Sequence, residues 1–276
     1  MPDVELTQGT VHYRDEGSGP IVVLIHGLLV DGTVWDRLVP ALSGRVRCIV
    51  PDLPLGAHRI AMKSGADLSP PGLARLIAEL LERLALQDVT LVGNDTGGGL
   101  CQLVVASHPD RLGRLVLTNC DAFENFPPPA LRLAIKALGH LPGAAVTVER
   151  LGRIAAVRRV AMGPLTVEPL PDHYAKQWLE ALRDPGVRRD LVRVSRGISA
   201  TYTLDAATKF GAFDKRVLIA WGVRDRFFPL AEGERLAAAF PRGQLERIDN
   251  ARTFVQMDAP ERLAELILER VPAAAG

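Results

Sequence analysis

The fold of this chain is decided by the stretch Leu91-Val92-Gly93-Asn94-Asp95-Thr96-Gly97-Gly98. An apolar run leads into a polar residue that has a glycine two positions before it and another two positions after it. The two glycines leave steric room for a sharp turn from a strand into a helix. Such a turn presents the side chain of Asp95 at the carboxyl end of a buried strand.

Two interpretations of Asp95 are compatible with this pattern. The first is a nucleophile elbow, in which the strand-to-helix turn exposes an attacking group, here a carboxylate instead of a hydroxyl. The second is that Asp95 only caps the helix that follows. A helix N-terminus favours the ionised carboxylate, so we expect Asp95 to be charged at neutral pH. The glycine spacing does not match that of phosphate-binding loops.

Short apolar runs alternate with amphipathic segments on both sides of this turn. Five runs predict parallel strands buried on both faces: Ile21–Ile25, Val46–Val50, Val89–Val92, Leu115–Leu117 and Val217–Ile219. Five segments predict helices: Val34–Leu42, Pro71–Leu84, Gly98–Ser107, Ala231–Phe240 and Pro260–Val271. An antiparallel edge hairpin is expected at Thr10–Asp15. The order predicts an α/β fold with a mostly parallel, doubly wound sheet.

The alternation stops between Ala122 and about Ala207, where prolines interrupt helical patches and no buried-strand run occurs. We therefore expect a core made of residues 1–121 and 208–276, with residues 122–207 inserted as a helical cap. A ligand pocket is expected between sheet and cap, and Asp95 should lie at the base of the largest one.

Composition restricts the possible partners. The formal net charge is +1, so nothing indicates binding to nucleic acid or to a membrane, and a small-molecule substrate is expected. The three cysteines lie in apolar stretches without paired spacing, which favours reduced thiols in a cytoplasmic protein and gives no support to a metal site. No cofactor is expected, and the sequence does not specify an oligomeric state.

Other polar residues follow the predicted strands at the same edge of the sheet. The turn His26-Gly27-Leu28 ends the first buried strand, where the backbone amide of Leu28 could join that of Thr96 in an oxyanion hole. The ring of His26 is expected to be structural. In Trp221-Gly222-Val223-Arg224-Asp225, the acid follows the last predicted strand, where it could orient a catalytic base.

These motifs, together with Phe254-Val255-Gln256-Met257-Asp258-Ala259-Pro260-Glu261, resemble the α/β-hydrolase superfamily over nearly the whole chain outside the cap. An aspartate at the elbow is similar to haloalkane dehalogenases and epoxide hydrolases. The resemblance implies that the Asp95 carboxylate attacks an sp³ carbon and forms an alkyl-enzyme ester. It also implies that Leu28 and Thr96 form the oxyanion hole, and that no cofactor or metal takes part.

The sequence departs from the pattern of these enzymes at three places. Dehalogenases usually have tryptophan after the nucleophile to hold the halide, whereas this chain has Thr96. Epoxide hydrolases use tyrosines of the cap as acids, and here only Tyr174 and Tyr202 are available. The position of the histidine that activates water holds Thr253, which cannot act as a base at neutral pH.

Two further residues are candidates for the missing acid or base. His58 lies in the loop that leaves the second buried strand at the same edge as Asp95, although a histidine in a surface loop is the alternative. Asp121 follows the Leu115–Leu117 strand, and in some dehalogenase-like relatives the orienting acid lies there instead of at Asp225.

Four functions remain open from the sequence. The first is a hydrolase of small, mostly apolar molecules, of the haloalkane or epoxide type, whose water is activated by a group other than residue 253. The second is a lyase, isomerase or cyclase in which Asp95 is a general base. The third is a binding protein without turnover, and the fourth is an enzyme whose base was deliberately replaced to trap an intermediate.

Overall fold

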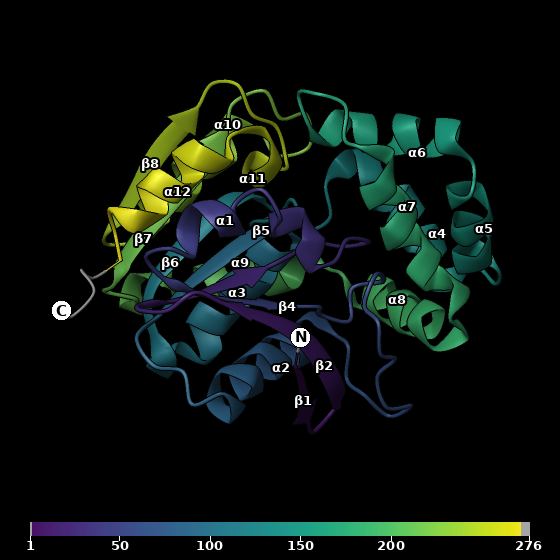
Figure 1. Ribbon diagram of the computed structural model, residues 1–276, viewed down its shortest axis with the longest axis horizontal. Coiled ribbons are helices and arrows are strands. Elements are labelled where there is room, and N and C mark those ends of the chain that lie inside the picture. The colour runs from purple at the N-terminus through teal and green to yellow at the C-terminus, as the bar shows by residue number, and fades with distance from the viewer. Residues whose placement is uncertain (1, 272–276) are drawn as a thin grey trace.

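A computed structural model describes residues 2–271 of the chain, and within them eight strands form one sheet (Figure 1). The strands are β1 (Asp3–Leu6), β2 (Gly9–Glu16), β3 (Ile21–Ile25), β4 (Arg47–Pro51), β5 (Val89–Asp95), β6 (Leu112–Cys120), β7 (Arg216–Gly222) and β8 (Gly243–Ile248). Their order across the sheet is β1-β2-β4-β3-β5-β6-β7-β8, and β5 and the elbow stand near the middle. The pairs β1–β2 and β2–β4 are antiparallel, and all other neighbouring strands of the described sheet are parallel.

The five apolar runs are confirmed as parallel strands. The hairpin expected within Thr10–Asp15 is wrong in its bounds, because these residues all lie in β2 and the hairpin forms between β1 and β2. Strand β8 was not predicted, because its sequence Gly-Gln-Leu-Glu-Arg-Ile alternates polar and apolar residues. It lies at the edge of the sheet, where most of its residues are only half-buried or exposed. The fold class is therefore confirmed as α/β with a mostly parallel sheet.

Helices cover both faces of the sheet, because neighbouring residues on each strand point in opposite directions. Val23 and Ile25 of β3 belong to the apolar core that also contains residues of α2 (Pro70–Arg83), α3 (Thr96–Ser107) and α10 (Leu230–Ala239). Val22 and Leu24 belong to the core on the other face, with residues of α1 (Val39–Leu42), α11 (Val255–Asp258) and α12 (Pro260–Leu268). The sheet is thus doubly wound.

The helix expected over Val34–Leu42 is wrong as a single element. Gly32–Trp35 forms a 3₁₀ turn, whose amide at Thr33 donates to the side chain of Asp31, and α1 begins only at Val39. The Asp31 side chain closes the first turn early, and the proline in the first turn of α1 starts a separate helix.

The segment between β6 and β7 holds six α-helices within the described residues, named here the inserted helices. They are α4 (Arg132–His140), α5 (Ala144–Gly152), α6 (Ala155–Met162), α7 (Asp172–Glu180), α8 (Pro185–Gly197) and α9 (Ala200–Ala207). In Figure 1, α4 to α8 stand together at one end of the molecule, beside the sheet. Helix α9 packs on α3 instead.

Buried polar contacts join the inserted helices to the loops that follow the strands. The indole Nε1 of Trp178 donates to Asp31 Oδ1 at 3.0 Å and to Thr33 Oγ1 at 2.8 Å. Asp190 of α8 accepts hydrogen bonds from the Met62 amide at 2.7 Å and from the imidazole of His58 at 3.3 Å. These contacts fix the inserted helices over the carboxyl edge of the sheet, where Asp95 lies.

Strand β5 runs directly into α3 at Asp95, whose φ of 54° and ψ of −133° are unusual for a residue with a side chain. The turn also brings α3 against the end of β3. A Cβ at Gly97 would lie 2.4 Å from the carbonyl oxygens of both Ile25 and His26. Only glycine at 97 therefore lets α3 pass the end of β3 this closely.

We predict that Gly97→Ala lowers the free energy of unfolding by about 3 kcal/mol, because two backbone carbonyls cannot both move away from the added methyl group. Urea denaturation followed by circular dichroism measures the change. The matched control is Gly211→Ala, since a Cβ there meets nothing within 4 Å. Equal stability of the two variants would show that the close approach at Gly97 is not required.

Candidate active site

The carboxylate of Asp95 turns back toward the end of β3. Its Oδ2 accepts a hydrogen bond from the Leu28 amide at 3.2 Å, and it makes no side-chain bond that would cap α3. The interpretation of Asp95 as a simple cap is therefore wrong. A Cβ at Gly27 would lie 2.1 Å from Asp95 Oδ2, so the glycine of the His26-Gly27 turn makes room for the carboxylate.

Burial raises the pKa of Asp95 to about 7, even though the amides of Thr96 and Leu28 lower it. The neighbouring Asp225 carboxylate raises the pKa further. The expectation that Asp95 is charged at neutral pH therefore holds only in part, because desolvation outweighs the helix N-terminus and the two amides. At neutral pH the carboxyl group is divided between its protonated and ionised forms.

Asp121 is a second buried carboxyl group beside Asp95. Its side chain is 1% exposed, and its Oδ2 accepts a hydrogen bond from the Thr96 hydroxyl at 3.1 Å, while Oδ1 has no partner among the described residues. Burial, reinforced by the charge of Asp95, raises the pKa of Asp121 well above its usual range. The pair therefore resists carrying two negative charges.

Asp225 lies in the loop after β7, where its Oδ1 accepts from the amides of Phe227 at 2.7 Å and Phe228 at 3.2 Å. Burial raises the pKa of Asp225, and the Phe227 amide and the Thr253 hydroxyl lower it by less. The hydroxyl of Thr253 thus lies beside this carboxyl group. Within residues 2–271, however, neither Thr253 Oγ1 nor Asp225 Oδ2 has a hydrogen bond of normal geometry, although both atoms are buried.

Asn94 holds the loop that carries Thr253 against the elbow. Its Nδ2 donates to the carbonyl oxygen of Thr253 at 2.7 Å, and its Oδ1 accepts from Gln256 Nε2 at 2.9 Å. Sequence analysis assigned no role to Asn94 or Gln256. The sequence does contain a signal for Asn94, because it is an amide in an otherwise apolar predicted strand. Polar groups that are buried in this way are nearly always hydrogen-bonded.

Asn119 near the end of β6 does the same for the Asp225 loop. Its Oδ1 accepts from the Gly222 amide at 2.6 Å, and its Nδ2 donates to the Gly222 carbonyl at 3.0 Å. A further residue that was not predicted from the sequence is Glu232 of α10, whose pKa burial raises to about 7. The charge of Asp225 raises the pKa of Glu232, so Glu232 belongs to the same group of carboxyls.

The histidines near this edge are engaged elsewhere. His26 Nε2 accepts from the Leu53 amide at 2.8 Å and Nδ1 donates to the Gly27 carbonyl at 2.9 Å, as expected of a structural ring. His58 is 2% exposed, its Nε2 donates to Asp190, and its Nδ1 accepts from the Gly56 amide at 3.4 Å. Nε2 of His58 therefore joins α8 and Nδ1 joins the loop after β4, and neither nitrogen is left for Asp95.

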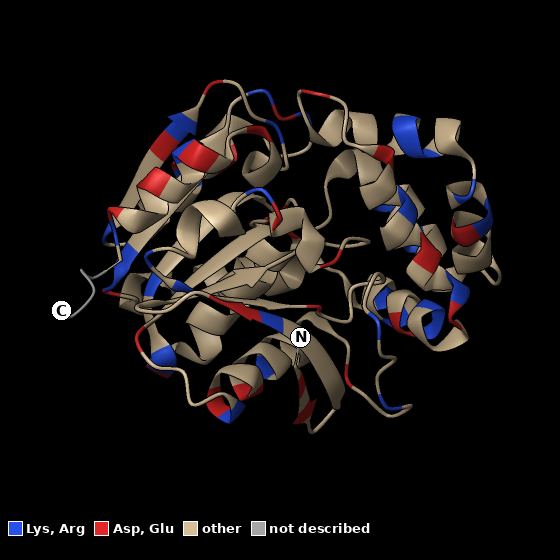
Figure 2. Ribbon diagram, in the orientation of Figure 1, with Lys and Arg blue, Asp and Glu red and all other residues tan. Residues whose placement is uncertain are grey.

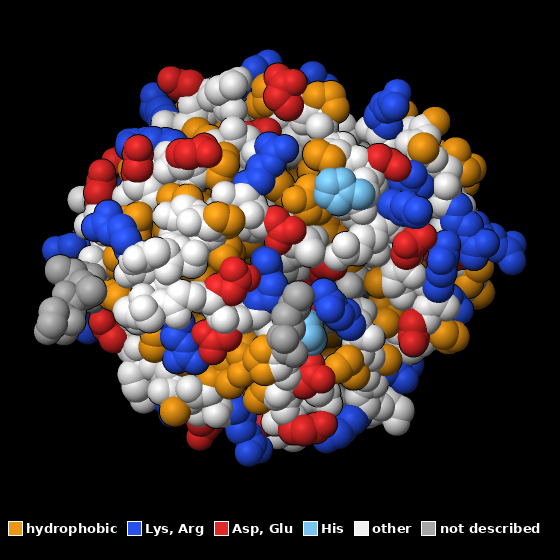
Figure 3. Space-filling view, in the orientation of Figure 1, with side chains coloured by type: hydrophobic (Ala, Val, Ile, Leu, Met, Phe, Trp, Pro, Cys, Tyr) orange, Lys and Arg blue, Asp and Glu red, His pale blue; other side chains and the backbone are white. Residues whose placement is uncertain are grey.

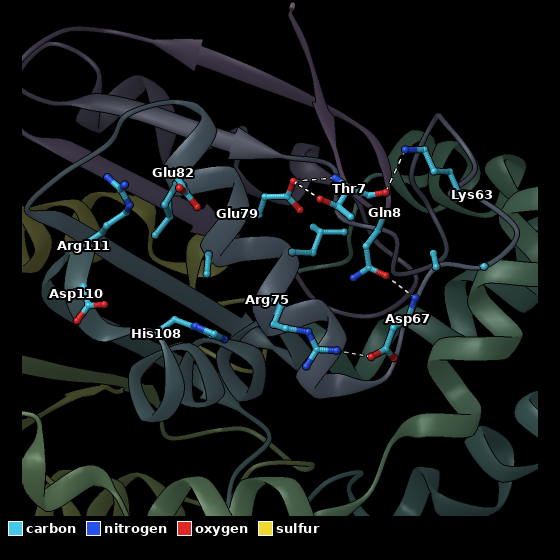
Figure 4. A pocket seen from close by; sticks show the side chains of 15 residues that line it. Thr7, Gln8, Lys63, Asp67, Arg75, Glu79, Glu82, His108, Asp110 and Arg111 are labelled. Carbon is cyan, nitrogen blue, oxygen red and sulfur yellow. Dashed lines mark hydrogen bonds and ion pairs between the residues drawn. The ribbon is translucent and has the colours of Figure 1, made fainter.

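The largest of the described hollows, about 830 Å³, lies elsewhere (Figure 4). It is lined by side chains from the turn after β1, from α2 and from the chain after α3, including Gln8, Arg75, Glu79 and His108. His108 follows the C-terminus of α3, whereas Asp95 precedes its N-terminus, about 18 Å away for a helix of this length. Asp95 lines none of the described hollows, and the expectation that it lies at the base of the largest pocket stays a prediction.

Two absences apply to the described part of the chain. No three His, Cys, Asp or Glu side chains converge in a way that could hold a metal ion. No helix between residues 2 and 271 has the length and apolar character needed to cross a membrane.

Comparisons with known proteins agree with this geometry. The haloalkane dehalogenase 2 of Mycobacterium tuberculosis is 31% identical over 273 residues, which covers 96% of this chain and 92% of that protein. A 2-hydroxy-6-oxo-6-phenylhexa-2,4-dienoate hydrolase of Burkholderia cepacia is 23% identical and covers 96% of this chain and 92% of its own length. The crystal structure of an alpha/beta hydrolase fold protein from Burkholderia ambifaria superposes with a TM-score of 0.82 at 26% identity, covering 98% of this chain and 97% of that one.

The model of the alpha/beta hydrolase family matches residues 22–266, which include the elbow and the loops of Asp225 and Thr253. The relatives in these comparisons are hydrolases, and one of them is a haloalkane dehalogenase. The chain therefore belongs to the alpha/beta hydrolase family and is a relative of the haloalkane dehalogenases.

Proposed function

We propose that this protein is a hydrolase of small, mostly apolar molecules in which the Asp95 carboxylate attacks an sp³ carbon. The observation that carries the proposal is the position of this carboxylate, which stands on a strained elbow and accepts a hydrogen bond from the Leu28 amide. A carboxylate can serve as a covalent nucleophile when the turn presents it to substrate and backbone donors orient it. The inserted helices would cover the site as a cap.

In the first step a carboxylate oxygen of Asp95 forms a bond to the substrate carbon. The bond from that carbon to the halide, or to the epoxide oxygen, breaks, and the leaving atom takes the electron pair. The product is an ester of Asp95. The Thr96 hydroxyl is not free to hold a leaving halide, because it already donates to Asp121.

In the second step water attacks the carbonyl carbon of the ester. The bond from that carbon to the alkoxy oxygen then breaks, the alcohol leaves with a proton, and the Asp95 carboxylate is restored. We propose that the amides of Leu28 and Thr96, which bond to the Asp95 carboxyl group, donate to the oxygen that becomes negative. Water must lose a proton to another group, and Thr253 cannot accept it. Asp225 is the base that we propose in its place, because its Oδ2 lies buried without a partner and burial raises its pKa. Asp121 is the alternative acceptor.

This substitute base should be weak. A carboxylate is a poorer base than an imidazole placed to take the proton directly, and general-base catalysis contributes about 10²-fold to 10⁴-fold. We therefore propose that formation of the ester outpaces its breakdown and that the ester accumulates.

A second function is favoured by the pKa of Asp95, which burial raises to about 7. A general base works best when its pKa lies near the working pH. Asp95 would then remove a proton from carbon in an elimination, isomerisation or cyclisation and return it later, with no ester and no water. Covalent trapping separates the two functions.

We predict that incubation with 1-bromohexane or 1,2-epoxyhexane leaves protein that is heavier by the alkyl group or by the whole epoxide. The ester should persist because its breakdown lacks an efficient base. Intact-mass spectrometry followed by peptide mapping should place the adduct on the peptide that contains Asp95. Asp95→Asn should give no adduct, whereas the matched variant Asp121→Asn should still be alkylated. An absence of adduct and of turnover for both compounds would favour the general-base function.

Adduct formation should depend on pH, because only the ionised carboxylate attacks. With a pKa of about 7 for Asp95, the rate constant should fall about tenfold per unit below pH 7 and become constant above pH 8. Because Asp225 raises the pKa of Asp95, Asp225→Asn should move the midpoint to lower pH. Quenched-flow mass spectrometry measures both profiles. A rate that is constant from pH 5 to 8 would contradict the raised pKa.

Thr253→His should increase the rate of ester breakdown by about 10²-fold, because the imidazole would stand beside the unpartnered oxygen of Asp225 and take the proton from water. Single-turnover experiments measure breakdown separately from alkylation.

Two further variants control this experiment. Thr253→Val keeps the shape of the side chain and should give no increase, and adding Asp225→Asn to Thr253→His should remove most of the gain. If Thr253→His folds and is alkylated at Asp95 but hydrolyses its ester no faster, then residue 253 is not a vacated base position.

A further inference from the structure

The outer helices α4, α5 and α6 expose large apolar side chains in a way that no other part of the described chain does. Of the six large hydrophobic residues that are exposed, five lie between residues 133 and 160, and the sixth is Leu204. The five are Leu133 at 83%, Val160 at 78%, Leu141 at 61%, Ile154 at 50% and Leu151 at 46% exposed. Globular proteins seldom gather such residues without a partner.

Basic residues accompany these apolar ones. Residues 132–162 contain six arginines and lysines but a single acid, Glu149, although the whole chain has a net charge of only +1. Each of the five exposed apolar side chains directly follows a basic residue: Arg132-Leu133, His140-Leu141, Arg150-Leu151, Arg153-Ile154 and Arg159-Val160. Figure 2 shows basic residues on these helices, and Figure 3 shows basic side chains beside apolar ones at this end of the molecule.

Some of these cations form ion pairs within the protein and some do not. Arg158 is buried and pairs with Asp172, and Arg153 pairs with Glu149 at 2.7 Å. Among the ion pairs of residues 2–271, none includes Lys136, Arg150 or Arg159, and all three are exposed. They point to an anionic partner outside the chain.

We propose that the outer face of α4, α5 and α6 binds the surface of an anionic lipid membrane. Aliphatic side chains interleaved with arginine and lysine fit the boundary between acyl chains and headgroups, since the apolar groups enter and the long cations remain at the phosphates. A second copy of the chain is a poor partner, because the same excess of positive charge would face itself. Nucleic acid would leave the aliphatic groups without a contact, and the five exposed apolar side chains include no aromatic ring for stacking on bases.

This binding is independent of the chemistry at Asp95. It revises the expectation from overall charge that no membrane partner exists, because a net charge of +1 averages this face with the more acidic remainder of the chain. The inserted helices would thereby lie against the lipid, in which small apolar molecules concentrate.

The test is co-sedimentation of the full chain with vesicles of phosphatidylglycerol and phosphatidylcholine, compared with phosphatidylcholine alone. Binding should occur on the anionic vesicles and weaken steeply with added salt. Each cation removed should lower partitioning about fivefold, so Arg150→Glu with Arg159→Glu should lower it at least about 25-fold. Leu133→Ser with Val160→Ser should lower it about tenfold.

The matched control is Arg45→Glu with Arg242→Glu, which reverses two exposed cations of the core and should leave binding within about twofold of the original chain. Thermal unfolding establishes that each variant is folded. The proposal is overturned if anionic vesicles do not bind the chain, if the control variant loses as much binding as Arg150→Glu with Arg159→Glu, or if sedimentation velocity shows that the α4 to α6 variants dissolve a dimer. Single-stranded RNA that binds this face and is not displaced by anionic vesicles would also overturn it.

Discussion

The arrangement of the site depends on the fixed position of one group, the carboxylate of Asp95 in the turn between β5 and α3. Its Oδ2 accepts from the Leu28 amide, and this position requires glycine at 27 and a positive φ at residue 95. Glycine at 97 then allows α3 to pass the end of β3. The turn is strained, and strain of this kind persists only where the surroundings enforce it. Here two neighbouring strands and the first turn of α3 enforce it together.

The loop of Thr253 is held as firmly as the elbow. Asn94 binds the Thr253 carbonyl and the Gln256 amide, and Asn119 binds both backbone groups of Gly222 ahead of Asp225. These polar groups lose their hydrogen bonds to water when they are buried. The bonds within the protein compensate for that loss. The loop that carries Thr253 therefore has a fixed position, so a base introduced at residue 253 would be held in place.

The sequence was enough to predict the five buried parallel strands and the elbow, because such strands are apolar throughout and the elbow glycines have a local steric cause. It also brought the correct loops to one edge, since parallel strands end there. What it could not predict depends on distant partners. His58 follows a strand at the same edge of the sheet as Asp95, but its ring is hydrogen-bonded to Asp190, which lies 132 residues later in the chain. Glu232 belongs to an ordinary amphipathic helix, and only the packing of α10 beside Asp225 reveals its altered pKa. Strand β8 was missed because an edge strand keeps polar residues.

The absence of a histidine affects both steps of an ester mechanism. Asp95, Asp121, Asp225 and Glu232 all have raised pKa values, and in each case burial is the largest cause. A cationic imidazolium among these groups would favour their ionised forms, as an opposite charge within a few ångströms does. Without it, a carboxylate at the elbow is half protonated near neutral pH, so fewer molecules can attack carbon at any moment. The same protonation equilibrium suits a group that takes up and returns a proton. In the mechanism that we propose, the raised pKa of Asp95 would therefore weaken it as a nucleophile and improve it as a general base. The chemistry at the elbow would depend on which of these two effects is larger.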